Sequence, residues 1–334
     1  MKRYIWMILA IVLFAVMVIS VGVGEATLSP FTVIKSFLGL GSSFDSLIIF
    51  QLRLPRIILA ALAGMALAVA GCILQAITRN SLATPEMMGI SGGASVAAVS
   101  IIMIFSTNKD SLSISLHYLP LLAFLGSTIV ALCIYLIAWK QGVSSLRLIL
   151  VGIGFYTLMN SFVHLIVLVG PLFRATQAKT WLTGSIYGTT WKEVVVLLPW
   201  LAVLIPIVYL YARSLTIHEL GDNTAIGLGV NVKRERFILL LLCTGLTGAA
   251  VAFVGGITFI GLIGPHLAKR FVGNNYRYVI PVAALIGAIM VVGADLIGRT
   301  LISPREIPAG VFTALVGVPY FLYLIYRNRG QVSS

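Results

Sequence analysis

The sequence predicts an all-α membrane protein whose chain crosses the bilayer about ten times. Of the 334 residues, 59% are hydrophobic and 10% are charged, whereas soluble globular proteins carry about 25% charged residues. The mean hydropathy of +1.05 is too high for a disordered chain. The apolar residues form continuous runs instead of the alternating pattern of a transmembrane β-barrel. A polytopic helical bundle is the class that remains.

Ten apolar runs approach the length of about 20 residues that a transmembrane helix needs. The first, residues 4–23, follows Lys2 and Arg3 and is longer than the apolar core of a secretory signal, so we expect it to remain as the first span. We expect one transmembrane domain over residues 1–334, with its longest inner connection at about 213–235. The other nine runs cover about 56–77, 87–105, 117–138, 147–168, 191–212, 236–255, 257–268, 279–297 and 309–326.

The positive charge follows the connections on one side of the predicted spans. The net charge is +13, and most of the 23 lysines and arginines fall in segments that share a side with the amino terminus. Cytoplasmic loops of membrane proteins carry this excess of basic residues. Both termini are therefore predicted to be cytoplasmic, and the charge does not indicate a nucleic-acid partner.

An internal repeat is visible in the sequence, with its second copy 184 positions after the first. Five crossings separate the two copies, so predicted spans 2–5 and 7–10 form an inverted repeat, which is a common plan of transporters. The alternative is that small residues recur wherever membrane helices pack closely. The matched residues are Leu62, Gly64, Ala66, Ala68 and Gly71 in the first copy and Leu246, Gly248, Ala250, Ala252 and Gly255 in the second.

The residues of common catalytic sites are missing from the sequence. It contains no Walker phosphate-binding loop, no His-Glu-x-x-His and no Gly-x-Ser-x-Gly motif. The three cysteines, Cys72, Cys133 and Cys243, lie in apolar runs without zinc-site spacing. We expect no catalytic residue, no resident metal and no cofactor, so any ATP hydrolysis must come from a separate subunit.

Apart from Glu193, which lies at the start of the run 191–212, Asp295 is the one acidic residue inside a predicted span. It precedes Arg299 by one helical turn, a spacing that favours a structural ion pair. A direct role of Asp295 in transport is the alternative. Proton relays usually place several acids or histidines at membrane depth. An ion-coupled secondary transporter is therefore the weaker hypothesis, and a membrane-embedded enzyme is weaker still.

Arg53 and Arg56 lie at the outer lip of the second predicted span, against the usual charge bias. Pro55 preorganises the first turn of that helix, and guanidinium groups bind carboxylates through paired hydrogen bonds. The two arginines are therefore candidates for docking an acidic partner. Snorkelling to lipid phosphates is an equally open interpretation.

The inner connection contains a segment, Leu220 to Gly229, that can form a short exposed helix. Asp222 or Asn223 can cap such a helix, and Gly229 can end it. An apolar face on it could enter a groove on another protein, and a plain amphipathic connector is the alternative. The predicted apolar face consists of Leu220, Ala225 and Leu228.

Six stretches in order resemble the permease subunits of type II ATP-binding-cassette importers for iron-siderophores, haem and cobalamin, the FecCD type. The resemblance runs from about Arg53 to Arg327. The family often has Pro at the position of Ser81, and Val or Ile at that of Gly264, which are minor departures. The stretches are Arg53-Leu54-Pro55-Arg56, Gln75 with Arg79-Asn80-Ser81-Leu82-Ala83-Thr84-Pro85, Trp181-Leu182-Thr183-Gly184-Ser185, Leu220 to Gly229, Gly261-Leu262-Ile263-Gly264-Pro265-His266-Leu267, and Glu306-Ile307-Pro308-Ala309-Gly310.

The resemblance implies ten helices per permease subunit and two such subunits, identical or not, around a central pathway. It further implies a cytoplasmic ATPase dimer and an extracytoplasmic binding protein. Ferric siderophore is the cargo expected from family frequency, with cobalamin or haem as alternatives.

The resemblance also assigns roles to individual residues, in three groups. Acidic residues of the binding protein would dock on Arg53, Arg56 and Arg299. The coupling helix that seats in the ATPase would contain Leu220, Gly221, Asp222, Ala225, Leu228 and Gly229. The pathway and its cytoplasmic gate would involve Asn80, Leu82, Ser144, Ser145, Gly152 and Gly154.

Overall fold

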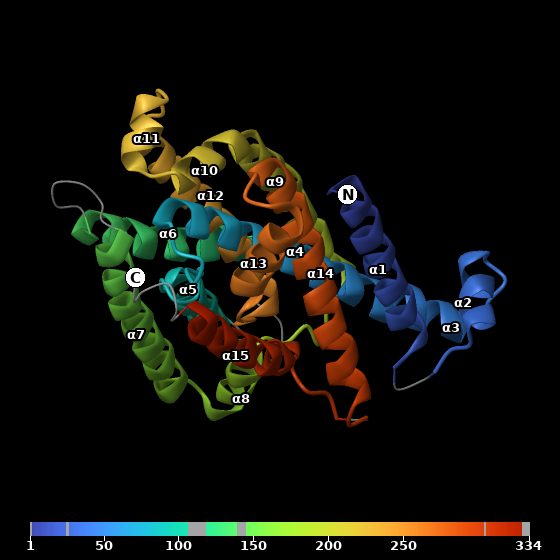
Figure 1. Ribbon diagram of the computed structural model, residues 1–334. Helices are drawn as coiled ribbons and strands as arrows, with labels where there is room; N and C mark the ends of the chain where they lie inside the picture. The colour runs from blue at the N-terminus through green and yellow to red at the C-terminus, as the bar shows by residue number, and fades with distance from the viewer. Residues whose placement is uncertain (1, 25–26, 106–117, 139–144, 304, 329–334) are drawn as a thin grey trace.

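The computed structural model describes residues 2–24, 27–105, 118–138, 145–303 and 305–328, and every regular element among them is a helix. Figure 1 shows the helices gathered into one bundle, with α1 to α3 at one side. The elements are α1 (Lys2–Gly22), α2 (Pro30–Phe37), α3 (Ser43–Leu47), the π-helix η1 (Ile48–Arg53), α4 (Leu54–Thr78), α5 (Ile90–Phe105), α6 (Leu119–Ala138), α7 (Ser145–Val169), α8 (Leu172–Leu182), α9 (Trp191–Leu210), α10 (Ala212–Glu219), α11 (Asp222–Gly227), α12 (Val232–Val254), α13 (Ile260–Val272), α14 (Tyr276–Thr300) and α15 (Ala309–Asn328).

Each of the ten predicted spans contains one helix, but the structure does not confirm ten crossings. Among the described residues, eight helices are long and apolar enough to cross a membrane. The two exceptions are α5 and α13, which begin later than predicted, at Ile90 and Ile260. Their late starts have local causes. Pro85 and Gly89 (φ +70°) precede α5, and Phe259 (φ +66°) precedes α13, so the chain cannot be helical there.

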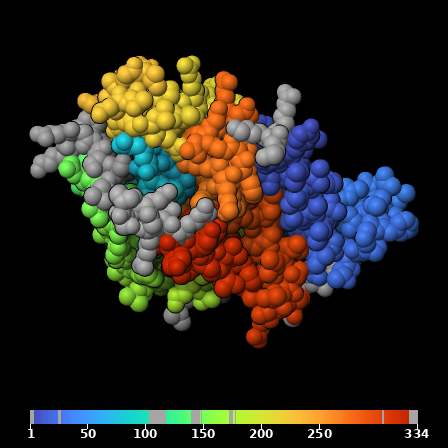
Figure 2. Space-filling model, viewed as in Figure 1, coloured from blue at the N-terminus to red at the C-terminus, as the bar shows by residue number. Residues whose placement is uncertain are grey.

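The helices α4 and α12 form the centre of the bundle. Most of their apolar length is buried, and their small residues let neighbouring helices approach closely. α4 packs along α13 and α14, while α12 packs along α6. By contrast, α7 and α15 leave most of their apolar length exposed in the single chain. Figure 2 shows both at the molecular surface, in green and red.

The two central helices run in opposite directions, as the inverted repeat predicts. Arg79 directly follows α4, and Arg236 lies in the first turns of α12, yet both contact the same side chain, Asp222. The bundle therefore has two distinct polar ends. We call them the Arg56 end, where α4 begins, and the Lys269 end, where α13 ends.

The matched glycines Gly64 and Gly248 confirm that the two halves pack alike. Gly64 lets α4 approach the backbone of α14 so closely that an added Cβ would overlap the carbonyl oxygen of Gly287. Gly248 occupies the same place in the second half, where an added Cβ would lie 2.8 Å from the backbone of Phe124 in α6. Each half thus needs a glycine at this position for a close helix pair.

The variant Gly64→Ala should destabilise the protein by about 1–3 kcal/mol, because backbone atoms of α14 would have to move to admit the new methyl group. Gly293→Ala is the matched control, since an added Cβ on α14 meets no atom within 4 Å at that position. Thermal unfolding in detergent measures both. Equal unfolding temperatures for the two variants would contradict the packing described here.

Candidate functional site

At the Lys269 end the predicted inner connection contains two short helices: α10, which precedes Leu220, and α11, which lies inside the predicted coupling segment Leu220 to Gly229. Gly221 separates them with φ +109°, a backbone conformation that side chains disfavour. α11 ends in a Schellman motif, in which the N–H of Val230 donates to the carbonyl of Ala225 at 3.0 Å and that of Gly229 to Ile226 at 2.9 Å. As predicted, Gly229 ends the helix. Figure 1 shows α11 projecting beyond the rest of the bundle.

The apolar surface of this segment differs from the prediction at one position. Leu220, Ile226 and Leu228 are exposed, whereas Ala225 is fully buried. Ala225 follows Asp222 by three residues and so shares its helix face. Because Asp222 is bonded to Arg236 of α12, that face is turned toward the bundle. The exposed apolar face therefore contains Ile226 in place of Ala225.

Ionic contacts hold the segment to the rest of the bundle. Asp222 accepts a hydrogen bond from Arg236 at 2.9 Å and lies 3.6 Å from the guanidinium of Arg79. Glu219 pairs with Lys269 of α13 and accepts a hydrogen bond from the Tyr276 hydroxyl of α14 at 2.9 Å. A displacement of α10 and α11 would therefore act on α12, α13, α14 and the turn after α4.

His218 is buried on α10, with its Nε2 3.4 Å from a carboxylate oxygen of Glu235. Burial is the largest influence on this side chain, and the positive charge of Arg236 comes next. Both lower the pKa of His218, and the attraction of Glu235 offsets them only in part. The imidazole is therefore neutral at physiological pH, because its ordinary pKa of about 6.5 already lies below 7.

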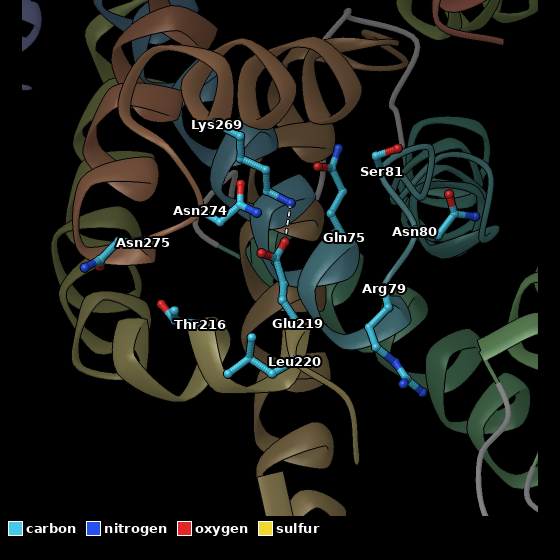
Figure 3. Close-up of a pocket in the computed structure, with 10 residues that line it drawn as sticks. All are labelled: Gln75, Arg79, Asn80, Ser81, Thr216, Glu219, Leu220, Lys269, Asn274 and Asn275. Carbon is cyan, nitrogen blue, oxygen red and sulfur yellow. Dashed lines mark hydrogen bonds and ion pairs between the residues drawn. The ribbon is translucent and has the colours of Figure 1, made fainter. Parts of the chain in front are cut away.

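A cavity of about 600 Å³ lies beside the coupling segment, between the end of α4, α10 and the connection from α13 to α14. Figure 3 shows the Glu219–Lys269 pair at its centre. The side-chain amide oxygen of Gln75, Oε1, is buried here without a hydrogen bond to another described residue. The lining residues are Gln75, Arg79, Asn80, Ser81, Thr216, Glu219, Leu220, Lys269, Asn274 and Asn275.

Two predicted gate residues, Asn80 and Leu82, lie in the turn at the edge of this cavity. The side-chain oxygen of Asn80 accepts the N–H of Leu82 at 2.9 Å. Arg79, directly before them, has φ +53°, which is uncommon for a residue with a side chain. The turn is thus tightly defined, and its Arg79 contacts the coupling helix through Asp222.

Gly152 and Gly154, two other predicted pathway residues, belong to α7 and do not line the cavity. Gly152 lies against the backbone of Met88, so that an added Cβ would be 3.1 Å from it, while Gly154 faces open space. Ser145 is the first residue of α7. Ser144 lies outside the described residues.

At the Arg56 end, Arg56 is bound by two carboxylates of its own chain. Its Nε and Nη2 donate to Asp295 of α14 at 2.8–3.1 Å, and its Nη1 donates to Glu306 at 2.9 Å. The predicted pair of Asp295 with Arg299 exists at 3.8 Å, but it is the weaker contact. Asp295 is therefore chiefly the partner of Arg56, a residue far from it in sequence.

The other two predicted docking residues, Arg53 and Arg299, are buried against α1. The guanidinium of Arg53 donates to the carbonyl of Val21 at 2.5 Å. Arg299 donates to the carbonyl of Ser20 and, at 2.6 Å, to its hydroxyl. The structure thus brings all three arginines to one end of the bundle, and of the three it leaves Arg56 the most accessible.

Glu86 is a buried acid that the sequence did not reveal. It falls in the turn between α4 and α5, outside the predicted spans, where the chain folds back into the bundle and buries it. Neither carboxylate oxygen has a hydrogen bond of ordinary geometry to another residue that the structure describes. Burial raises the pKa of Glu86, and the neighbouring Thr84 hydroxyl offsets only part of that rise. Pro85 and Gly89, on either side of it, were the available signals of a non-helical turn.

The variant Glu86→Gln should be more stable than the natural protein at pH 8. The raised pKa means that the folded state favours the protonated acid, so stability falls between the unfolded pKa of about 4.3 and the raised pKa of the folded state, by at most about 1.4 kcal/mol per pH unit. Glutamine is neutral at every pH. Thermal unfolding at pH 5 and pH 8 should show a larger gain at pH 8, and a gain independent of pH would contradict this explanation.

Comparison with known proteins decides the family. The model of the FecCD transport family matches residues 11–327, nearly the whole chain. The chain belongs to the FecCD transport family. With eight helices able to span a bilayer among its described residues, it is a multi-pass membrane permease.

Individual relatives align with this chain over almost their full length. The chain is 47% identical over 317 residues to the "Probable siderophore transport system permease protein YfhA" of Bacillus subtilis, covering 95% of this chain and 92% of the relative. It is 44% identical to the achromobactin transport system permease protein CbrC of Dickeya dadantii, covering 94% and 89%. The solved structure described as "An inward-facing conformation of a putative metal-chelate type ABC transporter" has a TM-score of 0.83 at 29% identity, covering 97% of this chain and 99% of that one.

Proposed function

We propose that this protein is the permease subunit of an ATP-driven importer that carries ferric siderophores across the cytoplasmic membrane. The observation that carries the proposal is the match to the FecCD family over residues 11–327. Relatives named for siderophore, achromobactin and Fe(3+)-citrate transport support iron chelates as the cargo. The chain supplies the pathway and a coupling segment, and a separate ATPase dimer supplies the energy.

The Lys269 end is the cytoplasmic end in this proposal, and both chain termini lie on that side. Its exposed basic residues, among them Arg79, Lys233 and Arg270, fit the charge bias of cytoplasmic surfaces. The coupling segment projects from this end with Leu220, Ile226 and Leu228 exposed. Such a short apolar projection fits a groove on an ATPase subunit.

A second permease subunit covers α7 and α15 in this proposal, and the cargo passes between the two subunits. Both helices expose large apolar side chains along most of their length. The exposed side of α7 also carries Gly154, where an added Cβ would meet nothing within 4 Å. Asn80 and Leu82 in the turn after α4 would form the cytoplasmic gate. Whether the second subunit is identical does not affect this arrangement.

Reconstitution tests the proposal directly. The permease should accumulate radioactive ferric siderophore in liposomes only with its ATPase, its extracytoplasmic siderophore-binding protein and ATP. A proton gradient in the absence of ATP should not drive this accumulation. Concentrative uptake by the permease alone would instead identify a secondary transporter.

The coupling segment can be tested by charge substitution. Leu220→Asp and Leu228→Asp should each reduce ATPase copurification about tenfold or more, because a buried, unpaired carboxylate opposes binding in an apolar groove. Asn223→Asp is the matched control, since it adds the same charge to α11 without removing an apolar side chain. If all three variants bind the ATPase equally, the segment is only a connector.

A further inference from the structure

The two carboxylates that bind Arg56 do so unequally. Asp295 makes a bidentate contact through two guanidinium nitrogens, and its side chain is 2% exposed. Glu306 makes a single contact to Nη1, and its side chain is 23% exposed. Breaking a buried, bidentate ion pair costs much free energy, whereas a partly exposed ion pair with a single hydrogen bond contributes little to stability. Glu306 is therefore the exchangeable partner.

The segment that carries Glu306 is held by its backbone and not by that ion pair. The N–H of Ile307 donates to the carbonyl of Gly298 at 2.9 Å, and the N–H of Gly310 donates to that of Gly184 at 3.0 Å. Arg56 in turn remains fixed by Asp295 when Glu306 leaves. Both sides of the contact therefore keep their positions if it opens.

Arg56 and Glu306 both line a cavity of about 350 Å³ at the Arg56 end. Thr180, Ser185 and Tyr187 supply polar groups to its wall, and the Tyr187 side chain is 73% exposed at the rim. Arginine and tyrosine are the side chains that most often dominate protein interfaces. Neither Arg53 nor Arg299 lines this cavity.

We propose that Glu306 is an internal competitor for docking: a carboxylate side chain of the extracytoplasmic binding protein that enters this cavity displaces Glu306 from Nη1 of Arg56. The inference rests on the proposed importer function and on the docking role that the family resemblance gives Arg56, and it adds the competitor. Displacement is required because Asp295, Glu306 and the incoming group would otherwise place three carboxylates around one guanidinium, and like charges repel at this distance. Glu306 thus weakens docking and shortens the time that the binding protein stays bound.

The test measures the affinity of the siderophore-binding protein, loaded with its ferric siderophore, for the assembled transporter in lipid nanodiscs. Glu306→Gln removes the competing charge and should strengthen binding about threefold, mainly by slowing dissociation. Asp45→Asn is the matched control, because Asp45 also lies at the Arg56 end but contacts Ser42 and not Arg56. It should leave the affinity unchanged.

The possible outcomes separate the inference from the function on which it rests. If Glu306→Gln leaves binding unchanged or weakens it while the natural transporter binds normally, the displacement is wrong and the importer function stands. If both variants strengthen binding equally, the gain comes from the lower negative charge of this end as a whole, and the proposal that Glu306 competes locally is wrong. If the natural transporter does not bind any loaded binding protein, the proposed importer function is wrong, and the inference that rests on it is wrong as well.

Discussion

Close backbone contact along α4 is the constraint on which the rest of the structure depends. Helices in lipid gain nothing from hiding apolar surface, so their association relies on packing, and small residues allow the closest packing. At Gly64, α4 meets the backbone of α14 at Gly287, and at Gly71 it meets the backbone of α13 at Gly261. Because α4 has almost no exposed surface, the other helices are placed relative to it.

The ion pairs described above lie at the two ends of the bundle. At one end Arg56 joins α4 to α14 and to the segment before α15. At the other, Glu219 and Asp222 join the coupling segment to α13, α12 and the turn after α4. The ion pairs at each end are therefore connected to those at the other by closely packed helices, of which α4 and α14 reach both. Such an arrangement suits the proposed function, in which one partner acts at each end of the bundle.

The sequence predicted local features well and long-range partners poorly. The presence of a helix in every predicted span, the glycine that ends α11 and the inverted repeat follow from short patterns, and the structure agrees with them, although α5 and α13 begin later than predicted. The burial of Glu86 and of Ala225 did not follow, because each depends on how a turn or short helix lies against distant helices. Asp295 was expected to pair mainly with Arg299, four residues away, but Arg56 lies closer. The proximity of those two residues is created by the α4–α14 packing.

The amino-acid sequence by itself determined the class of the protein, the approximate positions of its long apolar helices and its family. Those properties depend on composition, on apolar run length and on motifs that are contiguous in the chain. Tertiary structure alone decided which carboxylate binds which arginine, which side chains of the coupling segment face outward and where the two cavities lie. Each of these is a contact between residues far apart in sequence, and such contacts exist only once the helices have packed.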